Sequence, residues 1–285
     1  MLSVPCVTSL EQVEVPALIY GTAWKAERTA GLVEQAVAAG FKGIDTACQP
    51  KHYNEPGVGE ALAKLKQQGI PRDSLYLQTK FTPLSGQDPN NIPYDPSLPL
   101  PRQVAQSFET STKNLRTDYL DSLLLHSPLQ SFNATMEVWG ALEKIRREGG
   151  TRQLGISNCY DPALLQQLYQ QADIKPAVVQ NRFYADTGYD SELRSWCKEQ
   201  GIIYQSFWTL TANTHVLSAL AVGRIAEKYH CEPTQVLLRY VTQLGIVPLT
   251  GTTSAEHMRE DLQMFNFELD EGEMDNIDKL LGAGA

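Results

Sequence analysis

Three ionisable side chains of different chemical type follow three successive apolar runs of the chain. They are an acid, Asp45, a lysine, Lys80, and a histidine, His126. Taken singly, they have ordinary interpretations as a turn-forming aspartate, a solvated lysine and a hydrogen-bonded core histidine. Their shared position at the ends of apolar runs favours one common site.

The segment DTACQPKHYNE, residues 45–55, adds a histidine, His52, and a tyrosine, Tyr53, to this set. A lysine ammonium near a tyrosine hydroxyl lowers the pKa of that hydroxyl, and an aspartate paired with the lysine keeps the lysine charged. A nearby histidine can orient a substrate carbonyl. Such a group is suited to donate a proton to a developing alkoxide during carbonyl reduction. Because side chains supply no hydride, this chemistry requires a cofactor.

The elements that must position these residues are short apolar runs that alternate with amphipathic helical patterns. The runs have the uniform apolar character of strands buried on both faces of a parallel sheet. They cover residues 17–24, 40–47, 74–80, 120–126, 151–157, 176–183, 201–208 and 245–250. Eight strand–helix units predict a closed (β/α)8 TIM barrel of the α/β class. An open doubly wound sheet is the alternative, but Gly21-Thr22-Ala23-Trp24 after the first run lacks the GxGxxG spacing.

No internal repeat or linker divides the chain, so we expect a single domain over residues 1–285. Helical patterns lie at 29–40, 131–150, 161–172, 190–201, 254–265 and 269–280. Thr29 and Asp161 are the expected N-caps of two of them, and Pro162 suits a first helical position. Residues 81–101 carry six prolines and predict a long loop, of the kind that is usually functional or disordered.

Bulk composition excludes several classes of protein. The net charge of −9 argues against a nucleic-acid binder or a basic membrane-surface protein. No apolar stretch approaches the ~18 residues that span a bilayer. The five cysteines are scattered singly, without the spacing of a metal site or a disulfide framework. We therefore expect a cytoplasmic protein without a metal. Many barrels of the predicted kind are monomers, and the surface pattern indicates no oligomer, so we also expect a monomer.

Further motifs along the chain resemble those of the aldo-keto reductase superfamily. The motifs that carry the resemblance are GFKGIDTA…HYNEPGVGEAL (40–62), LYLQTK (75–80), LRTDYLDSLLLHSP (115–128), LGISN (154–158), VVQNRFY (178–184) and EDLQMFNFEL (260–269). They cover nearly the whole chain in the family's order. The resemblance implies a (β/α)8 barrel, a nicotinamide cofactor, and a catalytic tetrad of Asp45, a tyrosine, Lys80 and His126.

The resemblance also implies which residues hold the nicotinamide. Ser157, Asn158 and Gln180 are expected to hydrogen-bond its carboxamide. Phe207 takes the place of a tyrosine that stacks on the ring in the family, and Trp208 follows it. Without the resemblance, Phe207 and Trp208 would be interpreted as core aromatics.

The loop after the last strand departs from the family pattern of Pro-Lys-Ser followed by an arginine. Leu249 stands in the lysine position and His257 in the arginine position. A leucine cannot pair with the 2′-phosphate of NADP, so NAD(H) is a live alternative to the favoured NADP(H). The groups expected to hold the phosphate are the backbone N–H groups from Thr250 through Gly251 and Thr252, with the side chain of His257 or Arg259.

The tyrosine position itself is ambiguous. Counting back from Asn54-Glu55, in the family's Tyr-x-Asn-Glu pattern, places His52 there. The turn after Asp45 is longer than in the family, however, and only Tyr53 offers a hydroxyl of high pKa. We therefore expect Tyr53 to be the proton donor and His52 to line the substrate pocket.

The pocket is expected to be open and permissive. The long C-terminal tail of many relatives is not seen after 269–280, so we expect Trp24, Tyr53 and parts of loop 81–101 to line the pocket. The function that follows is NAD(P)H-dependent reduction of small-molecule aldehydes or ketones. Two alternatives remain open: a non-catalytic, cofactor-binding regulatory subunit, and a specialised reductase of a sugar or polyketide-type substrate.

Overall fold

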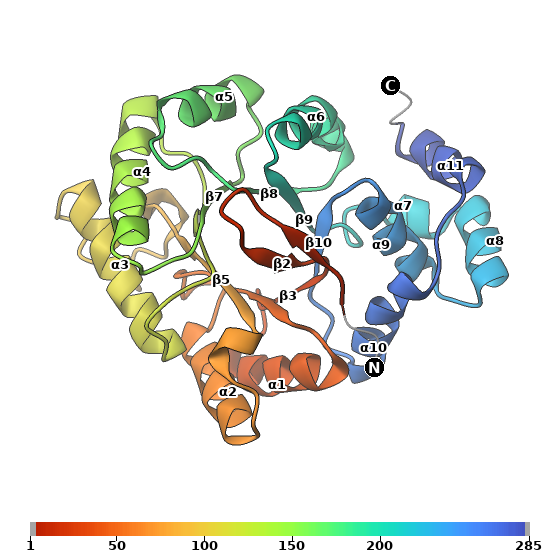
Figure 1. The fold of residues 1–285 in the computed structure, drawn as a ribbon, viewed down its shortest axis with the longest axis horizontal. Helices are drawn as coiled ribbons and strands as arrows, with labels where there is room; N and C mark the ends of the chain where they lie inside the picture. The colour runs from red at the N-terminus through yellow and green to blue at the C-terminus, as the bar shows by residue number, and fades with distance from the viewer. Residues whose placement is uncertain (1–3, 283–285) are drawn as a thin grey trace.

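Eight parallel strands close into a barrel in the computed structural model, which describes residues 4–282 (Figure 1). The strands are β3 (Ile19–Gly21), β4 (Gly43–Asp45), β5 (Tyr76–Phe81), β6 (Ser122–Leu125), β7 (Leu154–Ser157), β8 (Val178–Arg182), β9 (Ile203–Phe207) and β10 (Val247–Thr250). β10 pairs with β3 and closes the ring. Seven of the eight strands lie wholly within the apolar runs that predicted them, and β5 extends one residue further. The predicted (β/α)8 barrel is confirmed.

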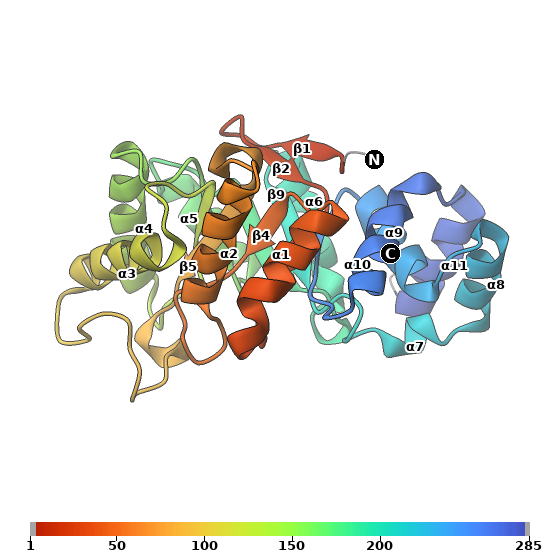
Figure 2. The same cartoon turned by 90° about the horizontal axis from the view of Figure 1, so that it is seen from below.

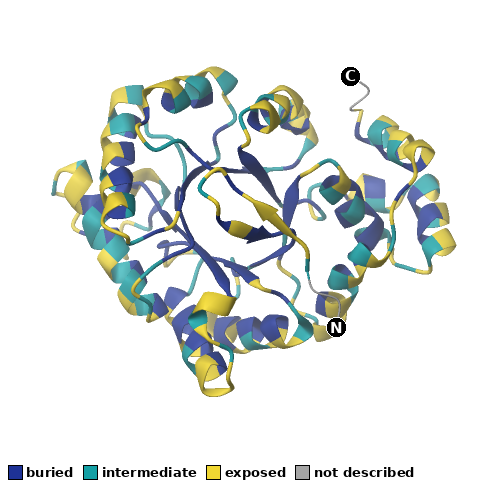
Figure 3. Ribbon diagram, in the orientation of Figure 1, coloured by how far each residue is buried: buried dark blue, intermediate teal, exposed yellow. Residues whose placement is uncertain are grey.

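Helices surround the barrel and turn their buried faces toward it or toward one another (Figure 3). They are α1 (Thr29–Ala39), α2 (Glu55–Gln67), α3 (Leu100–Leu115), α4 (Phe132–Arg147), α5 (Pro162–Gln171), α6 (Ser191–Glu199), α7 (Thr214–Leu217), α8 (Leu220–Tyr229), α9 (Pro233–Gln243), α10 (Ala255–Gln263) and α11 (Glu271–Leu281). Helices α7, α8, α9 and α11 gather on one side of the barrel. No helix among residues 4–282 is long and apolar enough to cross a membrane.

The predicted helix caps have different outcomes. Asp161 caps α5 as expected, since its carboxylate accepts a hydrogen bond from the N–H of Ala163 at 2.9 Å. The prediction for Thr29 is wrong: Thr29 is the first residue of α1, and Arg28 occupies the N-cap position. The reason is a short 3-10 helix over Ala26–Arg28, which leads directly into α1.

A hairpin of β1 (Cys6–Thr8) and β2 (Glu14–Pro16) precedes the barrel and was not predicted. It lies across the barrel axis in Figure 1. Val13 and Val15 are buried against inward-facing side chains at the start of the barrel strands, including those of Ile19 and Val178. The hairpin therefore closes the end of the barrel opposite to the carboxyl ends of the strands.

Side chains that alternate along each strand fill the barrel in layers. On β8, Val178 belongs to the apolar layer at the closed end, and Gln180 and Arg182 follow on the same face. Strand register places Gln180 beside Gln205 of β9. A polar layer therefore lies directly above the apolar layer and below the barrel mouth.

Residues 82–99 are largely irregular, as predicted, apart from a 3-10 turn over Leu84–Gly86, but the predicted bounds of loop 81–101 are too wide, because β5 includes Phe81 and α3 begins at Leu100. Figure 2 shows the loop beside α3, on the side of the molecule opposite to the β1–β2 hairpin. The buried hydroxyl of Tyr94 donates to the carbonyl of Thr82 at 2.9 Å. The loop is thus anchored close to the end of β5, at the same end of the barrel as the carboxyl ends of the strands.

Candidate active site

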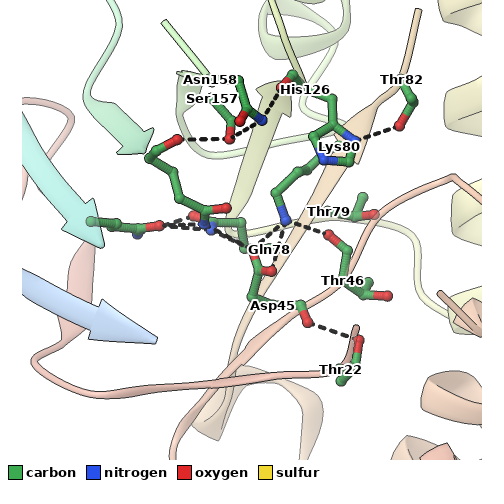
Figure 4. A network of polar contacts seen from close by, with 12 residues as sticks. Thr22, Asp45, Thr46, Gln78, Thr79, Lys80, Thr82, His126, Ser157 and Asn158 are labelled. Atoms are coloured by element: carbon green, nitrogen blue, oxygen red, sulfur yellow. Dashed lines mark hydrogen bonds and ion pairs between the residues drawn. The ribbon is translucent and has the colours of Figure 1, made fainter. Parts of the chain in front are cut away.

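A buried ion pair joins the ends of β4 and β5 (Figure 4). Lys80 Nζ lies 2.7 Å from both carboxylate oxygens of Asp45 and donates to the carbonyl of Thr46 at 2.8 Å. Both side chains are almost completely buried. Burial lowers the pKa of Lys80, and the Asp45 carboxylate opposes this shift. The pair is held together because each charge lacks water to replace its partner.

Three glutamines complete the surroundings of the Asp45 carboxylate. Gln78 Nε2 donates to Asp45 Oδ1 at 2.7 Å and Gln180 Nε2 donates to the same oxygen at 3.0 Å. Both amides also donate to Gln205 Oε1, at 2.8 and 2.9 Å. The side chain of Asp45 is therefore fixed from two sides by neutral donors as well as by Lys80. Sequence inspection singled out only Gln180 of these three.

Tyr53 lies above the ion pair at the mouth of the barrel. Lys80 Nζ is 5.4 Å from the centroid of its ring, and the His126 ring is 6.1 Å away in an edge-on arrangement. Burial, followed by the charge of Asp45, raises the pKa of Tyr53 well above its ordinary value of 10.0. The expected lowering of this pKa is wrong as a net effect, because burial and the Asp45 carboxylate outweigh the stabilisation of the phenolate by the Lys80 ammonium, which is itself bonded to Asp45. Tyr53 consequently keeps its proton at neutral pH.

His126 follows β6 and is held by a hydrogen bond of 2.6 Å between its Nδ1 and Thr82 Oγ1. Burial, and then the positive charge of Lys80, hold the pKa of His126 well below its ordinary value of 6.5. The imidazole is therefore neutral at physiological pH. Among the hydrogen bonds of residues 4–282, none involves its Nε2, so this nitrogen is free to contact a ligand.

The lengthened turn between Asp45 and Tyr53 is bound to loop 81–101. Gln49 Nε2 donates to the carbonyl of Gly86 at 2.6 Å, and Gln87 Nε2 donates to the carbonyl of Cys48 at 2.9 Å. Gln49 Oε1 also lies 3.0 Å from the Nδ1 of His52. The extra residues of the turn thus lie between Tyr53 and loop 81–101, and hydrogen bonds fix them to that loop.

His52 and Tyr53 point to different surroundings. The His52 ring packs on Trp24 with 3.9 Å between the ring centroids. Trp24 is 66% exposed, so this contact lies at the outer rim of the site. Burial lowers the pKa of His52, with a smaller effect from Lys51. Only Tyr53 of the two lies against both Lys80 and His126.

A cavity of about 1560 Å³ opens at the carboxyl ends of the strands and extends to α10. Most of the predicted site residues line it: Trp24, Asp45, His52, Tyr53, His126, Ser157, Asn158, Gln180, Phe207, Trp208, Thr250, Gly251, Thr252 and His257. Lys80 lies buried beneath it. Arg259 is exposed on α10 and does not line it.

The residues expected around a nicotinamide lie together on β7 and β8. Ser157 Oγ donates to the carbonyl of Gln180 at 2.7 Å. Asn158 Nδ2 donates to the carbonyl of His126 at 2.9 Å. Asn158, Trp24 and Trp208 all follow barrel strands with positive φ, at 52°, 61° and 57°. Asparagine adopts this conformation fairly readily, but tryptophan rarely does, and such backbone strain is concentrated at functional sites.

Loop 81–101 borders a second, smaller cavity of about 590 Å³. Asn91 and Pro93 of the loop face Trp24, His52 and Tyr53 there. No residue of the loop lines the larger cavity. The loop thus approaches the site on the side of the lengthened turn, where it forms part of the wall of the smaller cavity.

Sequence inspection missed several charged residues that line the larger cavity. Lys25 follows Trp24 and donates to the carbonyl of Gly251. Burial, and then Arg28, lower the pKa of Lys25. Its place directly after the first apolar run, residues 17–24, was the signal that could have identified it. No group of three His, Cys, Asp or Glu within residues 4–282 is arranged to hold a metal ion.

Comparison with known proteins matches the chain to one family along nearly its whole length. The model of the Aldo/keto reductase family matches residues 17–214 and 209–281. Glyoxal reductase of Bacillus subtilis is 33% identical over 248 residues, which cover 87% of this chain and 82% of that protein. The NAD/NADP-dependent indole-3-acetaldehyde reductase of Schizosaccharomyces pombe is 31% identical, over 94% of this chain and 92% of that protein.

Solved structures agree with these matches. The aldo/keto reductase from Brucella melitensis has a TM-score of 0.82 and 28% identity, over 98% of this chain and 100% of that chain. Fold and site together define a barrel oxidoreductase that acts on carbonyl groups. The chain belongs to the aldo/keto reductase family. The resemblance seen in its motifs is confirmed.

Proposed function

We propose that this protein is an NAD(P)H-dependent reductase of small aldehydes or ketones, with Tyr53 as the proton donor. The observation that carries the proposal is the position of Tyr53 and His126 on the cavity, directly above the buried Asp45–Lys80 pair. Stable packing does not require this arrangement. It places two polar aromatic side chains over a charge pair beside an open cavity, where a ligand can reach them.

The residues of the cavity fit a nicotinamide cofactor. Gln180 uses its amide N–H groups on Asp45 and Gln205, and no hydrogen bond among residues 4–282 involves its Oε1. That oxygen and the Asn158 side chain suit a carboxamide, which both donates and accepts. Phe207 offers an apolar ring at the same end of the cavity. When bound, the cofactor supplies the hydride that the side chains cannot.

The chain's own residues would handle the carbonyl oxygen. His126 is neutral and can donate from Nε2 to orient the carbonyl. Tyr53 remains protonated because its pKa is raised, and it can transfer its proton when negative charge develops on that oxygen. The Lys80 ammonium, 5.4 Å from the Tyr53 ring centroid, would stabilise the phenolate that forms. Asp45 acts through Lys80 and is a positioning residue.

The proposal extends to the cofactor's phosphate. By the family resemblance, the end of the cavity at α10 would take the 2′-phosphate of NADP(H). Leu249 and His257 line this end, together with Glu256, Glu260 and Asp261. Burial raises the pKa of Asp261 to about 6, so its carboxylate is largely ionised at neutral pH. The family resemblance favours NADPH, but these carboxylates repel a phosphate. We therefore propose that NADPH is favoured only weakly, by less than about tenfold, and that NADH is also used.

Turnover with a panel of aldehydes tests the proposal. Purified protein is mixed with NADPH or NADH and short aliphatic and aromatic aldehydes, and loss of the reduced nicotinamide is followed. Cofactor binding is measured separately by fluorescence. We expect turnover with several aldehydes. Tight cofactor binding without turnover of any carbonyl compound would refute the proposal and favour the regulatory interpretation.

A further inference from the structure

Arg182 is a cation of the cavity that the proposed chemistry does not use. It is the last residue of β8 and lies two positions after Gln180, so both side chains face the barrel interior. It lines the larger cavity. Among the ion pairs and side-chain hydrogen bonds of residues 4–282, none involves its guanidinium, and its Nε is buried without a partner. The positive charge is therefore uncompensated within the described residues.

Three other partly buried arginines among residues 4–282, Arg72, Arg146 and Arg239, have carboxylate partners, and Arg194 donates to the carbonyl of Tyr189. Arg72 lies 2.8 Å from Asp121, and Arg146 lies 2.7 Å from Glu11. Asp186 also lines the larger cavity, yet it is exposed and forms no ion pair with Arg182. An arginine left without an anion costs free energy unless a ligand or solvent satisfies its donors.

Aromatic rings hold the Arg182 guanidinium in place. Its central carbon lies 4.1 Å from the centroid of the Trp208 ring, 5.0 Å from that of Tyr184 and 6.0 Å from that of Phe207. The face of an aromatic ring attracts the cation, but it does not accept hydrogen bonds from the N–H groups, which point outward in the plane of the guanidinium. The group is thus oriented in advance, with its planar fork of donors available for a bidentate partner.

We propose that Arg182 binds the anionic end of the substrate, a carboxylate or phosphate, while the substrate carbonyl lies at Tyr53 and His126. This inference rests on the proposed carbonyl reduction. Strands β6 and β8 are separated by one strand, so their ends lie about 10 Å apart at the usual strand spacing. The arginine side chain spans part of that distance, and the substrate spans the rest between its anionic end and its carbonyl group. The favoured substrate is therefore a short aldehyde or ketone that carries an acid group at its other end.

Matched substrates provide the kinetic test. 4-Carboxybenzaldehyde carries the anion, and methyl 4-formylbenzoate is its neutral counterpart. We expect Arg182→Met to lower kcat/KM for the acid by at least about tenfold and to change kcat/KM for the ester by less than about threefold. Arg182→Lys, which keeps the charge without the planar fork, should lie between. Arg102→Met on α3, an exposed arginine outside both cavities, is the control.

The pyrophosphate of the cofactor has the same chemistry as the proposed ligand, so cofactor affinity must be measured with the same variants. Unchanged affinity for NADPH and NADH in Arg182→Met supports the substrate assignment. An equal loss for acid and ester together with weaker cofactor binding would assign the arginine to the cofactor instead. No loss for the acid would also overturn the proposal.

A binding measurement separates this inference from the proposed function, because it needs no turnover. Calorimetry compares terephthalate with benzoate on protein saturated with oxidised cofactor. We expect wild type to bind terephthalate about tenfold more tightly than benzoate, and Arg182→Met to bind the two equally. Equal affinities in wild type that are also unchanged in Arg182→Met would refute the role of Arg182 even if aldehydes are reduced. The expected difference would support it even if none of the tested aldehydes reacts.

Discussion

Substitution of Lys80 by methionine is expected to cost far more stability than its volume suggests. Methionine fills much of the same space, but the change leaves the Asp45 carboxylate buried with only the amides of Gln78 and Gln180 as donors, at 2.7 and 3.0 Å. Breaking a buried ion pair by removing one partner typically costs about 3–5 kcal/mol. Asp45→Asn should cost a similar amount, because it leaves the buried Lys80 ammonium without its carboxylate and with only neutral acceptors, such as the Thr46 carbonyl at 2.8 Å.

The double variant Asp45→Asn/Lys80→Met distinguishes electrostatics from packing. With both charges gone, no buried charge is left unpaired, and asparagine can still accept from the two glutamines. The two single costs would sum to about 6–10 kcal/mol if they were independent, whereas we expect the double variant to lose about 3 kcal/mol or less. The coupling energy is therefore expected to be at least about 3 kcal/mol.

Urea unfolding followed by circular dichroism measures these differences through the transition midpoints. Reduction of an aldehyde, measured in parallel, should be impaired in all three variants, so recovered stability would not be accompanied by recovered activity. Single costs below about 1 kcal/mol, or costs that simply add in the double variant, would refute the interpretation of Asp45 and Lys80 as a tightly coupled buried pair.

Three further predictions concern the cofactor, the pH dependence and the packing. Leu249→Lys should raise the ratio of kcat/KM with NADPH to that with NADH by about tenfold, worth about 1.4 kcal/mol, while Leu249→Met should leave it unchanged; an equal ratio in both variants would exclude this position from the phosphate site. Because the pKa of His126 is lowered and that of Tyr53 is raised, His126 stays neutral and Tyr53 stays protonated, so the rate of reduction should be flat from about pH 6 to about pH 9; an acid limb near 6.5 in the pH profile would contradict the burial of His126. Gly59→Ala should destabilise the protein by at least about 1–3 kcal/mol, since an added Cβ would lie 2.0 Å from the backbone oxygen of Asn114; Gly31→Ala, with no atom within 4 Å of its added Cβ, is the control and should be neutral or stabilising in thermal unfolding.

The barrel could be predicted from the sequence because parallel strands that are buried on both faces consist of nearly uninterrupted apolar residues, which are easy to recognise. All eight strands begin within those runs, and their ends place Asp45, Lys80 and His126 at one end of the barrel. The β1–β2 hairpin escaped prediction because each strand has three residues and β1 is exposed, so neither presents a long apolar signal. Thr29 was misplaced because the 3-10 turn before it has no distinctive composition.

The electrostatics of the site could not be predicted from residue types. Whether a nearby lysine lowers the pKa of a tyrosine depends on how deeply the tyrosine is buried and on the other charges around it, and at Tyr53 burial and Asp45 determine the direction. The glutamine layer was missed because Gln78 and Gln205 look like ordinary polar residues within strand runs. Arg182 was likewise overlooked within the motif VVQNRFY. Only the structure shows that it lines the cavity and that its Nε is buried without a partner.

The choice between Tyr53 and His52 as the proton donor is the central claim. Turnover of one aldehyde with saturating NADPH should be measured for Tyr53→Phe, His52→Ala and Tyr169→Phe, the last being a tyrosine on α5 outside both cavities. General acid catalysis contributes about 10²–10⁴-fold, so Tyr53→Phe should lower kcat by at least about a hundredfold. His52→Ala should keep kcat within about tenfold of wild type, and Tyr169→Phe should match wild type. A large loss in His52→Ala with activity retained in Tyr53→Phe would contradict the assignment.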